Sequence, residues 1–154
     1  MDTRRFIGVW RLVSWSARLP DGSIGTPFGS APVGTLIYAA DGTMISSLMS
    51  ADRAPLGLSM EELAACRRQW LGLEHSAIDN AKAKQRFLNA ALLFNAYAGR
   101  FSVDDMRIHH YVEVALFPDW IGKRLTRRYQ FEADRLTLTS DETKQEDNLV
   151  WKRR

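Results

Sequence analysis

The chain has 154 residues, of which 45% are hydrophobic and 25% are charged, and its formal net charge is +3. These values are typical of a globular protein with a core of its own, and we expect a single domain over residues 1–154. An internal disulfide is excluded, because Cys66 is the single cysteine. No repeat or low-complexity segment is present in the sequence.

Basic residues are scattered along the chain, apart from short groups at 123–124, 127–128 and 152–154. No basic helix or basic arm accompanies them, so we expect no nucleic-acid partner. No apolar segment reaches membrane-spanning length and no apolar leader precedes the first strand, so we expect no membrane partner and a cytoplasmic location. The sequence leaves open whether the protein forms a homodimer.

Alternating apolar residues predict strands in the first third of the chain. The first strand is rich in β-branched and aromatic residues, and Pro20-Asp21-Gly22 follows it as a turn. Asp41-Gly42 is a hairpin signal between the third and fourth strands. The predicted strands cover residues 6–18, 23–28, 33–40 and 43–50.

Two helices are predicted after these strands. Ser59-Met60-Glu61-Glu62 is a capping box, and apolar residues at helical spacing follow it. This pattern predicts a helix over residues 60–73. A second helix is predicted over residues 79–93, because alanines and Phe87 fall on one of its faces.

Strands resume in the second half of the chain, over residues 95–103, 107–120, 123–133, 136–139 and 148–152, with a polar loop over 140–147. About eight or nine strands joined by tight turns predict an antiparallel meander, which loses its exposed edges by closing into a barrel. We therefore expect a mainly β protein whose barrel is wide enough for one small ligand. The inserted helical pair is expected to cap one mouth. A β-sandwich is the alternative, although it needs no helical pair at this point.

Several segments support a resemblance that extends over nearly the whole chain. They are Gly8–Trp15, which contains a Gly-x-Trp motif, Pro32–Tyr38, Asp41–Gly42, Tyr97–Phe101, His109–Val114, Phe117–Gly122, Arg135–Thr139 and Leu149–Trp151. With these segments in this order, the chain resembles the lipocalin-like domain family of small microbial β-barrel proteins. The resemblance implies a closed barrel with a small-molecule cavity, and it is poor over residues 59–93. Some lipocalin-like barrels in natural-product pathways act as cyclases or isomerases, whereas others only bind.

The segment 107–120 is predicted to be a long strand closed by a turn at Pro118-Asp119, and it carries polar residues among apolar ones. His109, Tyr111 and Glu113 share one face, and His110 and Val112 share the other. The sequence leaves open which face lines the interior. His109 and Glu113 lie about 13 Å apart along a strand, and the two histidines point to opposite faces, so we expect no metal site here.

Arg127 is predicted to point inward, because it shares a face with Leu125, Tyr129 and Phe131. A guanidinium in that position needs a carboxylate or an anionic ligand as its partner. The Arg127-x-Tyr129 pattern is similar to the carboxylate clamp of intracellular fatty-acid-binding barrels. The alternatives are an internal ion pair with Glu113 and exposure near a barrel mouth.

Three functions remain open for such a barrel. The first is the binding of a small hydrophobic or amphipathic molecule without any cofactor. The second is a cofactor-free isomerase, cyclase or dehydratase acting on a natural-product-like substrate in the same cavity, with His110, Glu113 and Tyr38 as candidate catalytic residues. A third, an interaction module whose barrel is filled by its own aromatic residues, has no cavity. The candidate ligand-binding residues are Arg127, Tyr129, Trp10, Met49, Tyr97, Phe101, Tyr111 and Trp120.

Overall fold

The computed structural model describes residues 3–75, 81–140 and 146–154. The chain forms two compact units, a barrel made of Met1–Ala51 and Asn95–Arg154 and a helical unit made of Asp52–Phe94. Each unit is described by itself below. That residues 1–154 act as one domain, and that the helical pair caps a barrel mouth, stay predictions.

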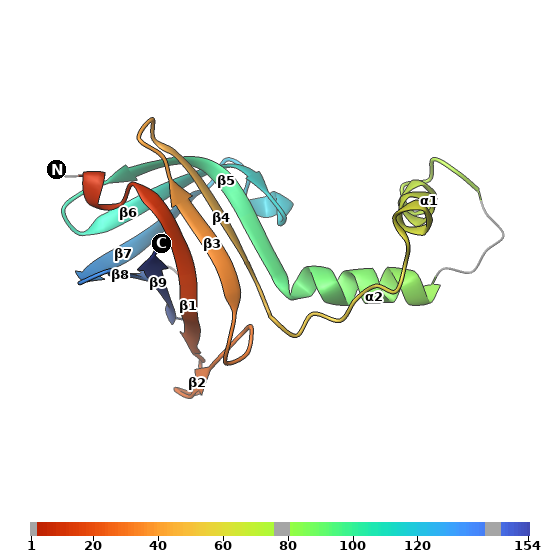
Figure 1. Cartoon of the computed structure of the whole chain (residues 1–154), viewed down its shortest axis with the longest axis horizontal. Coiled ribbons are helices and arrows are strands. Elements are labelled where there is room, and N and C mark those ends of the chain that lie inside the picture. The colour runs from red at the N-terminus through yellow and green to blue at the C-terminus, as the bar shows by residue number, and fades with distance from the viewer. Residues whose placement is uncertain (1–2, 76–80, 141–145) are drawn as a thin grey trace. The chain divides into compact units, whose positions relative to one another are not determined.

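Strands of the described chain form one antiparallel sheet (Figure 1). They are β1 (Gly8–Arg18), β2 (Ile24–Gly25), β3 (Val33–Tyr38), β4 (Thr43–Met49), β5 (Phe94–Val103), β6 (Arg107–Ala115), β7 (Arg124–Glu132), β8 (Arg135–Ser140) and β9 (Glu146–Arg153). β1 pairs with both β3 and β9, which closes eight strands into a barrel and leaves β2 as an extra strand beside β1. The predicted closed, lipocalin-like antiparallel barrel is confirmed.

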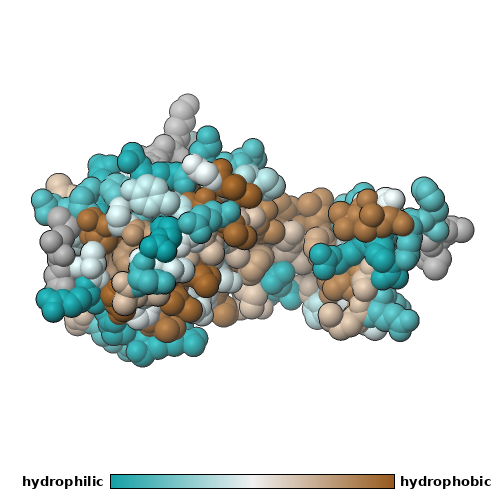
Figure 2. All heavy atoms as spheres, turned by 90° about the horizontal axis from the view of Figure 1, so that it is seen from above, coloured by the Kyte–Doolittle hydropathy of each residue, from teal (hydrophilic) through white to brown (hydrophobic). Residues whose placement is uncertain are grey.

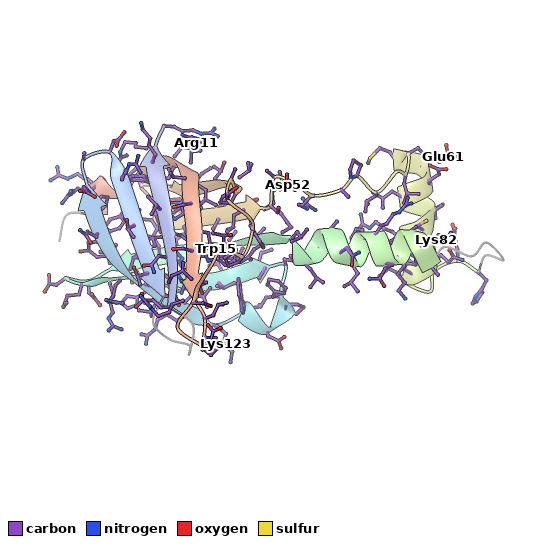
Figure 3. The ribbon with its side chains drawn as sticks, turned by 90° about the horizontal axis from the view of Figure 1, so that it is seen from below. Arg11, Trp15, Asp52, Glu61, Lys82 and Lys123 are labelled. Atoms are coloured by element: carbon purple, nitrogen blue, oxygen red, sulfur yellow. The ribbon has the colours of Figure 1, made fainter. Side chains whose placement is uncertain are left out.

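A bulge in β1 reverses which residues face the core. Simple alternation places Arg11 and Trp15 on one face, yet Arg11 is exposed while Trp15 packs against the core (Figure 3). The pairing of β1 with β9 shifts between Leu12 and Ser14, so one extra residue is inserted there. Such an insertion turns every later side chain to the opposite face, which explains the inward position of Trp15.

A second bulge acts on β6, the strand that carries the two histidines. The pairing of β5 with β6 shifts between Ala98 and Gly99, opposite Glu113. Val112, before the bulge, is buried, whereas Val114 after it is 66% exposed. A Cβ atom on Gly99 would lie 1.9 Å from the carbonyl oxygen of Tyr111, so only glycine allows the strands to approach here.

The sequence prediction for the end of β6 was a turn at Pro118-Asp119 that closes the strand. The strand ends at Ala115, and the short 3-10 helix η2 (Pro118–Trp120) forms at the position of that turn. Proline at the first position of η2 has no N–H for a strand ladder and is suited to the start of a helical turn. The backbone then returns into β7.

The N-terminal segment plugs one end of the barrel. It begins with the 3-10 helix η1 (Thr3–Arg5), after which Phe6 is almost fully buried. The Phe6 ring lies 4.9 Å from the ring of Tyr129 and 4.8 Å from that of Phe131, both at the end of β7. Trp10 donates its indole N–H to the Phe6 carbonyl oxygen at 2.8 Å. These contacts close the barrel end at which β3 also finishes.

The helical unit contains α1 (Met60–Trp70) and α2 (Ala81–Leu92). The predicted capping box is present, since the Glu62 N–H donates to the Ser59 hydroxyl and the Ser59 N–H donates to the Glu62 carboxylate. The aromatic rings of Trp70 and Phe87 join the helices at 5.4 Å.

The helices end earlier than predicted, the second at Leu92 and not at residue 93. The first ends at Trp70, ahead of the predicted residue 73, because Gly72 adopts a positive φ of 71° there. The start predicted for the second helix, at residue 79, falls outside the described residues. Neither helix has a buried residue, and apolar side chains lie at the surface of this unit (Figure 2). No helix among the described residues is long and apolar enough to cross a membrane.

Candidate functional site

A buried histidine lies between two tyrosines in the barrel interior. His110 on β6 is 1% exposed and shares the inward face with Ile108 and Val112. The Tyr38 hydroxyl on β3 lies 2.7 Å from His110 Nε2, and the Tyr97 hydroxyl on β5 lies 2.8 Å from His110 Nδ1. Two consecutive strands, β5 and β6, and the distant strand β3 therefore supply one hydrogen-bonded group, which we call the Tyr-His-Tyr cluster (Tyr38, His110 and Tyr97).

The imidazole of this cluster is uncharged at neutral pH. The pKa of His110 is lowered to about 3, mainly by burial and to a smaller extent by the nearby Arg127 and His109. A neutral imidazole carries one N–H donor and one lone pair. One tyrosine must therefore donate a hydrogen bond to His110, while the other accepts one from it.

Both tyrosines keep their phenolic protons. Burial is the main cause that raises the pKa of Tyr38 well above its ordinary value and also raises that of Tyr97. The positive charge of Arg127 acts in the opposite direction on both hydroxyls. The nearby Ser46 hydroxyl on β4 also lowers the pKa of Tyr97. The polar cluster thus extends to a fourth strand.

Arg127 faces the same interior from β7. Arg127 pairs across the sheet with Ile108, and Leu125, two residues earlier on β7, pairs with His110. Its guanidinium donates to the Thr126 carbonyl oxygen at 3.0 Å and to the Ser140 hydroxyl at 3.5 Å. Within residues 3–75, 81–140 and 146–154, no carboxylate forms an ion pair with Arg127.

Two inward-facing apolar residues beside the cluster are only partly buried. Phe101 on β5 and Leu125 on β7 both pair with His110 across the sheet, so all three side chains lie in one inward-facing row. His110 is buried, but Phe101 and Leu125 are only partly buried although they pack against the core. The ring of Phe101 lies 4.7 Å from that of Tyr38. Apolar surface that is still accessible therefore adjoins the Tyr-His-Tyr cluster.

Several predicted site residues lie elsewhere. Glu113 and Tyr111 belong to the outer face of β6, where Tyr111 is 41% exposed and its hydroxyl lies 3.2 Å from that of Ser102. The considered ion pair between Glu113 and Arg127 is therefore not formed. Met49 lies on the face of β4 opposite to Ser46. The structure does not bring these three candidates together with His110.

The Arg127-x-Tyr129 clamp is not assembled either. Tyr129 faces inward, but its hydroxyl donates to the carbonyl oxygens of Asp104 at 3.2 Å and Asp105 at 3.3 Å in the turn after β5. Its ring packs against Phe6 at the plugged end. The tyrosine hydroxyls near the Arg127 charge are instead those of the Tyr-His-Tyr cluster.

Two tryptophans among the predicted ligand contacts have different surroundings. Trp10 is fully buried, and the Arg153 guanidinium lies 4.2 Å from the centre of its ring, so it packs and closes the barrel end. Trp120 is partly buried, and its ring lies 5.8 Å from that of Tyr97 in an edge-on arrangement. Trp120 therefore adjoins the cluster, whereas Trp10 does not contact it.

Two further polar groups of the interior were not predicted as site residues. Ser46 alternates with the buried residues Met44 and Leu48, and that pattern marks its inward position. The indole N–H of Trp151 is buried and has no hydrogen-bond partner among the described residues. No sequence signal distinguishes that tryptophan from an ordinary core residue.

His109, the neighbour of His110, points away from the interior. Its Nε2 lies 2.8 Å from the Asp104 carboxylate, and its Nδ1 lies 3.1 Å from the Thr126 hydroxyl. The two histidines do face opposite ways, as the strand pattern predicted. Within the part of the chain that the structure describes, no group of three or more His, Cys, Asp or Glu side chains is placed to hold a metal ion.

Comparisons with known proteins identify the fold family. The model of a family described as "Lipocalin-like domain" matches residues 7–154. A lipocalin-like protein from Bacteroides uniformis has a similar structure, with a TM-score of 0.47, 10% identity and coverage of 97% of this chain and 99% of that chain. A mutant of the fluorescent protein UnaG is also similar, with a TM-score of 0.41, 12% identity and coverage of 97% and 96%. No curated protein matches the chain.

Proposed function

Since the chain belongs to the lipocalin-like domain family, we propose that it binds a small hydrophobic or amphipathic molecule inside its barrel. One observation carries the proposal. Phe101 and Leu125 face inward on either side of the buried His110, yet both stay partly exposed to solvent. Covering such apolar surface is favourable by about 25 cal/mol per Å², which is a source of affinity for an apolar ligand.

Charge in the same interior supports an acidic group on the ligand. Arg127 has only two uncharged partners among the described residues, the carbonyl oxygen of Thr126 and the hydroxyl of Ser140. A partly buried guanidinium is stabilised by a carboxylate or a similar anion. An amphipathic ligand would place its apolar part on Phe101 and its acidic group near Arg127.

The alternative function is a cofactor-free isomerase, cyclase or dehydratase acting on a natural-product-like substrate in the same interior. Such chemistry needs a base that can take a proton near neutral pH. Both nitrogens of His110 are hydrogen-bonded and its pKa is lowered to about 3, so it is a weak base at that pH. Glu113, the other candidate base, lies on the outer face. These observations favour binding over catalysis.

The proposal includes no metal, no cofactor and no nucleic-acid or membrane partner. It assigns the protein to the cytoplasm and leaves the formation of a homodimer to measurement. The interior, rather than an outer surface, is proposed as the site.

The test is native mass spectrometry of the full chain isolated gently from its own host. The expected result is a second species whose added mass is that of one small molecule, lost when the protein is unfolded in organic solvent. Protein isolated with the Arg127→Met substitution should carry less of it, while Arg124→Met, at an exposed position of the same strand, should carry the same amount. A folded protein that carries no small molecule and takes up no hydrophobic dye would contradict the proposal.

A further inference from the structure

Two hydrogen bonds join Tyr38, His110 and Tyr97 in the barrel interior. Ser46 is buried on β4, the strand beside that of Tyr97, and it acts on the Tyr97 hydroxyl. With Ser46 taken as the fourth member, the hydrogen-bond chain runs Tyr38, His110, Tyr97, Ser46 and has three links. Each hydroxyl has one hydrogen and the neutral imidazole has one, so four hydrogens serve three links. One hydrogen must therefore remain at an end of the chain, either on Tyr38 or on Ser46.

The two arrangements differ in the tautomer of His110. With the extra hydrogen on Ser46, the Tyr38 hydroxyl donates to Nε2, and Nδ1–H donates to Tyr97, whose hydroxyl donates to Ser46. With the extra hydrogen on Tyr38, every link is reversed, Nε2 carries the proton and the Tyr38 O–H is free to donate. Among the described residues Tyr38 has His110 as its only hydroxyl partner, so that O–H has no acceptor from the protein.

The first arrangement is the more stable one without a ligand. A buried hydroxyl hydrogen without an acceptor costs about 1–3 kcal/mol. A serine hydroxyl rotates freely and reaches backbone carbonyls close to it in sequence, whereas a tyrosine hydroxyl is held far from its own backbone. The resting hydrogen therefore belongs on Ser46, and His110 rests as the Nδ1–H tautomer.

An acceptor oxygen beside Tyr38 reverses this preference. Arg127 faces the same interior from the strand beside His110, and its positive charge acts on Tyr38, Tyr97 and His110. The adjoining ring of Phe101 is partly exposed, 4.7 Å from the ring of Tyr38. A ligand on that ring brings a polar group within reach of both the Tyr38 hydroxyl and the Arg127 charge.

We propose that the chain Tyr38–His110–Tyr97–Ser46 is a reversible hydrogen-bond relay that recognises an acceptor oxygen of the ligand, best a carboxylate. Binding turns the Tyr38 hydroxyl from His110 to the ligand and converts His110 to the Nε2–H tautomer. The number of hydrogens is the same in both states. The inference rests on the proposed binding function and adds the chemistry of the ligand's polar end.

The relay is tested by nitrogen and carbon NMR of the full chain labelled in histidine, which distinguishes the two tautomers directly. Three histidines are present, so His110 is assigned by the loss of its signal in His110→Gln. The free protein should show Nδ1–H. Ser46→Ala removes the acceptor for the Tyr97 hydrogen, and we expect it to give a mixture of tautomers without any ligand. A free wild-type protein in the Nε2–H form would overturn the relay.

The ligand-dependent arm uses laurate, an aliphatic carboxylate, with dodecylammonium as the cationic counterpart. Laurate should convert His110 to Nε2–H, whereas dodecylammonium should not. Tyr38→Phe should abolish the conversion. It should also lower the affinity for laurate about tenfold to a hundredfold, because one hydrogen bond to a charged group is lost. Tyr111→Phe, which removes an exposed hydroxyl of the outer face, should behave as the wild type.

The outcomes separate the relay from the binding function. Perturbed signals of Phe101 and Leu125 with laurate, without a change of tautomer, would overturn the relay and leave binding intact. Failure of laurate and of the anionic dye anilinonaphthalene sulfonate to perturb these signals would contradict the proposed function and the relay together. Should Tyr38→Phe not fold, the Ser46→Ala measurement on the free protein decides the relay by itself.

Discussion

Arg127 and His110 face one barrel interior from adjacent strands, and burial, helped by the charge of the guanidinium, lowers the pKa of the imidazole. The histidine stays neutral and is held by two tyrosines, while the arginine keeps its charge with only uncharged partners among the described residues. The interior therefore contains a neutral hydrogen-bonded cluster beside a cationic side chain. Packing alone does not explain the cluster or the cation, because buried polar groups cost free energy unless they are paired.

Acid should destabilise the protein through His110. Its pKa is about 3 in the folded state and about 6.5 in an unfolded chain, so between these values the unfolded state binds the additional proton. The contribution of His110 to the free energy of unfolding is therefore complete above pH 6.5 and is lost as the pH decreases towards 3. The loss is at most about 1.4 kcal/mol per unit of pKa difference between the folded and unfolded states. Urea unfolding across this pH range is the measurement.

His110→Gln should show a flatter dependence on pH than the wild type between pH 6.5 and pH 4. His75→Gln, at an exposed position of the helical unit, serves as the matched control and should follow the wild type. A wild-type stability that does not change over this range, or an equal slope in His110→Gln, would refute the assignment of a neutral buried imidazole.

Removal of one hydroxyl of the cluster should cost stability. Tyr38→Phe leaves His110 Nε2 without its partner in a buried place, and we expect a loss of about 1–3 kcal/mol in the free energy of unfolding. Tyr111→Phe removes an exposed hydroxyl and should change it by less than about 0.5 kcal/mol. Urea denaturation of the three proteins at pH 7 checks both values, and equal losses in the two variants would speak against a structural cluster.

The bulge on β6 should depend on Gly99. An added Cβ atom would meet the Tyr111 carbonyl oxygen at 1.9 Å, so Gly99→Ala must push the strands apart. We expect destabilisation by about 3 kcal/mol or more. Gly25→Ala is the matched control, because its Cβ atom would approach Leu19 no closer than 3.5 Å and should be tolerated. Thermal unfolding followed by circular dichroism distinguishes the two, and an unperturbed Gly99→Ala protein would show that the described register is incorrect.

The closed barrel and the inward position of Arg127 were within reach of the sequence, because strand alternation and turn residues carry that information. For β6 the alternation gave two faces but left open which one, that of His109 or that of His110, points inward. The two bulges were not within reach, since one inserted residue reverses all later faces without a distinct sequence signature. The pattern therefore placed Trp15 beside Arg11 on one face, although Trp15 turns inward.

The pairing of Tyr38 and Tyr97 with His110 was also beyond the sequence. The three residues were each considered as lining a pocket, but their contact depends on the curvature that brings β3 across to β6. Strand pairing fixes only neighbours, and β3 and β6 are separated by β4 and β5 in the sheet. The plug by Phe6 was missed for the same reason, because its partners lie on β3 and β7.

The most direct test of interior binding is isothermal titration of laurate into the wild type, Arg127→Met and Arg124→Met. We expect the wild type and Arg124→Met to bind equally, because Arg124 is exposed. Arg127→Met should bind at least about tenfold more weakly, since it loses one charged partner of the carboxylate. Equal affinity in all three folded proteins, or no binding to the wild type, would contradict an interior site that pairs Arg127 with an acidic ligand.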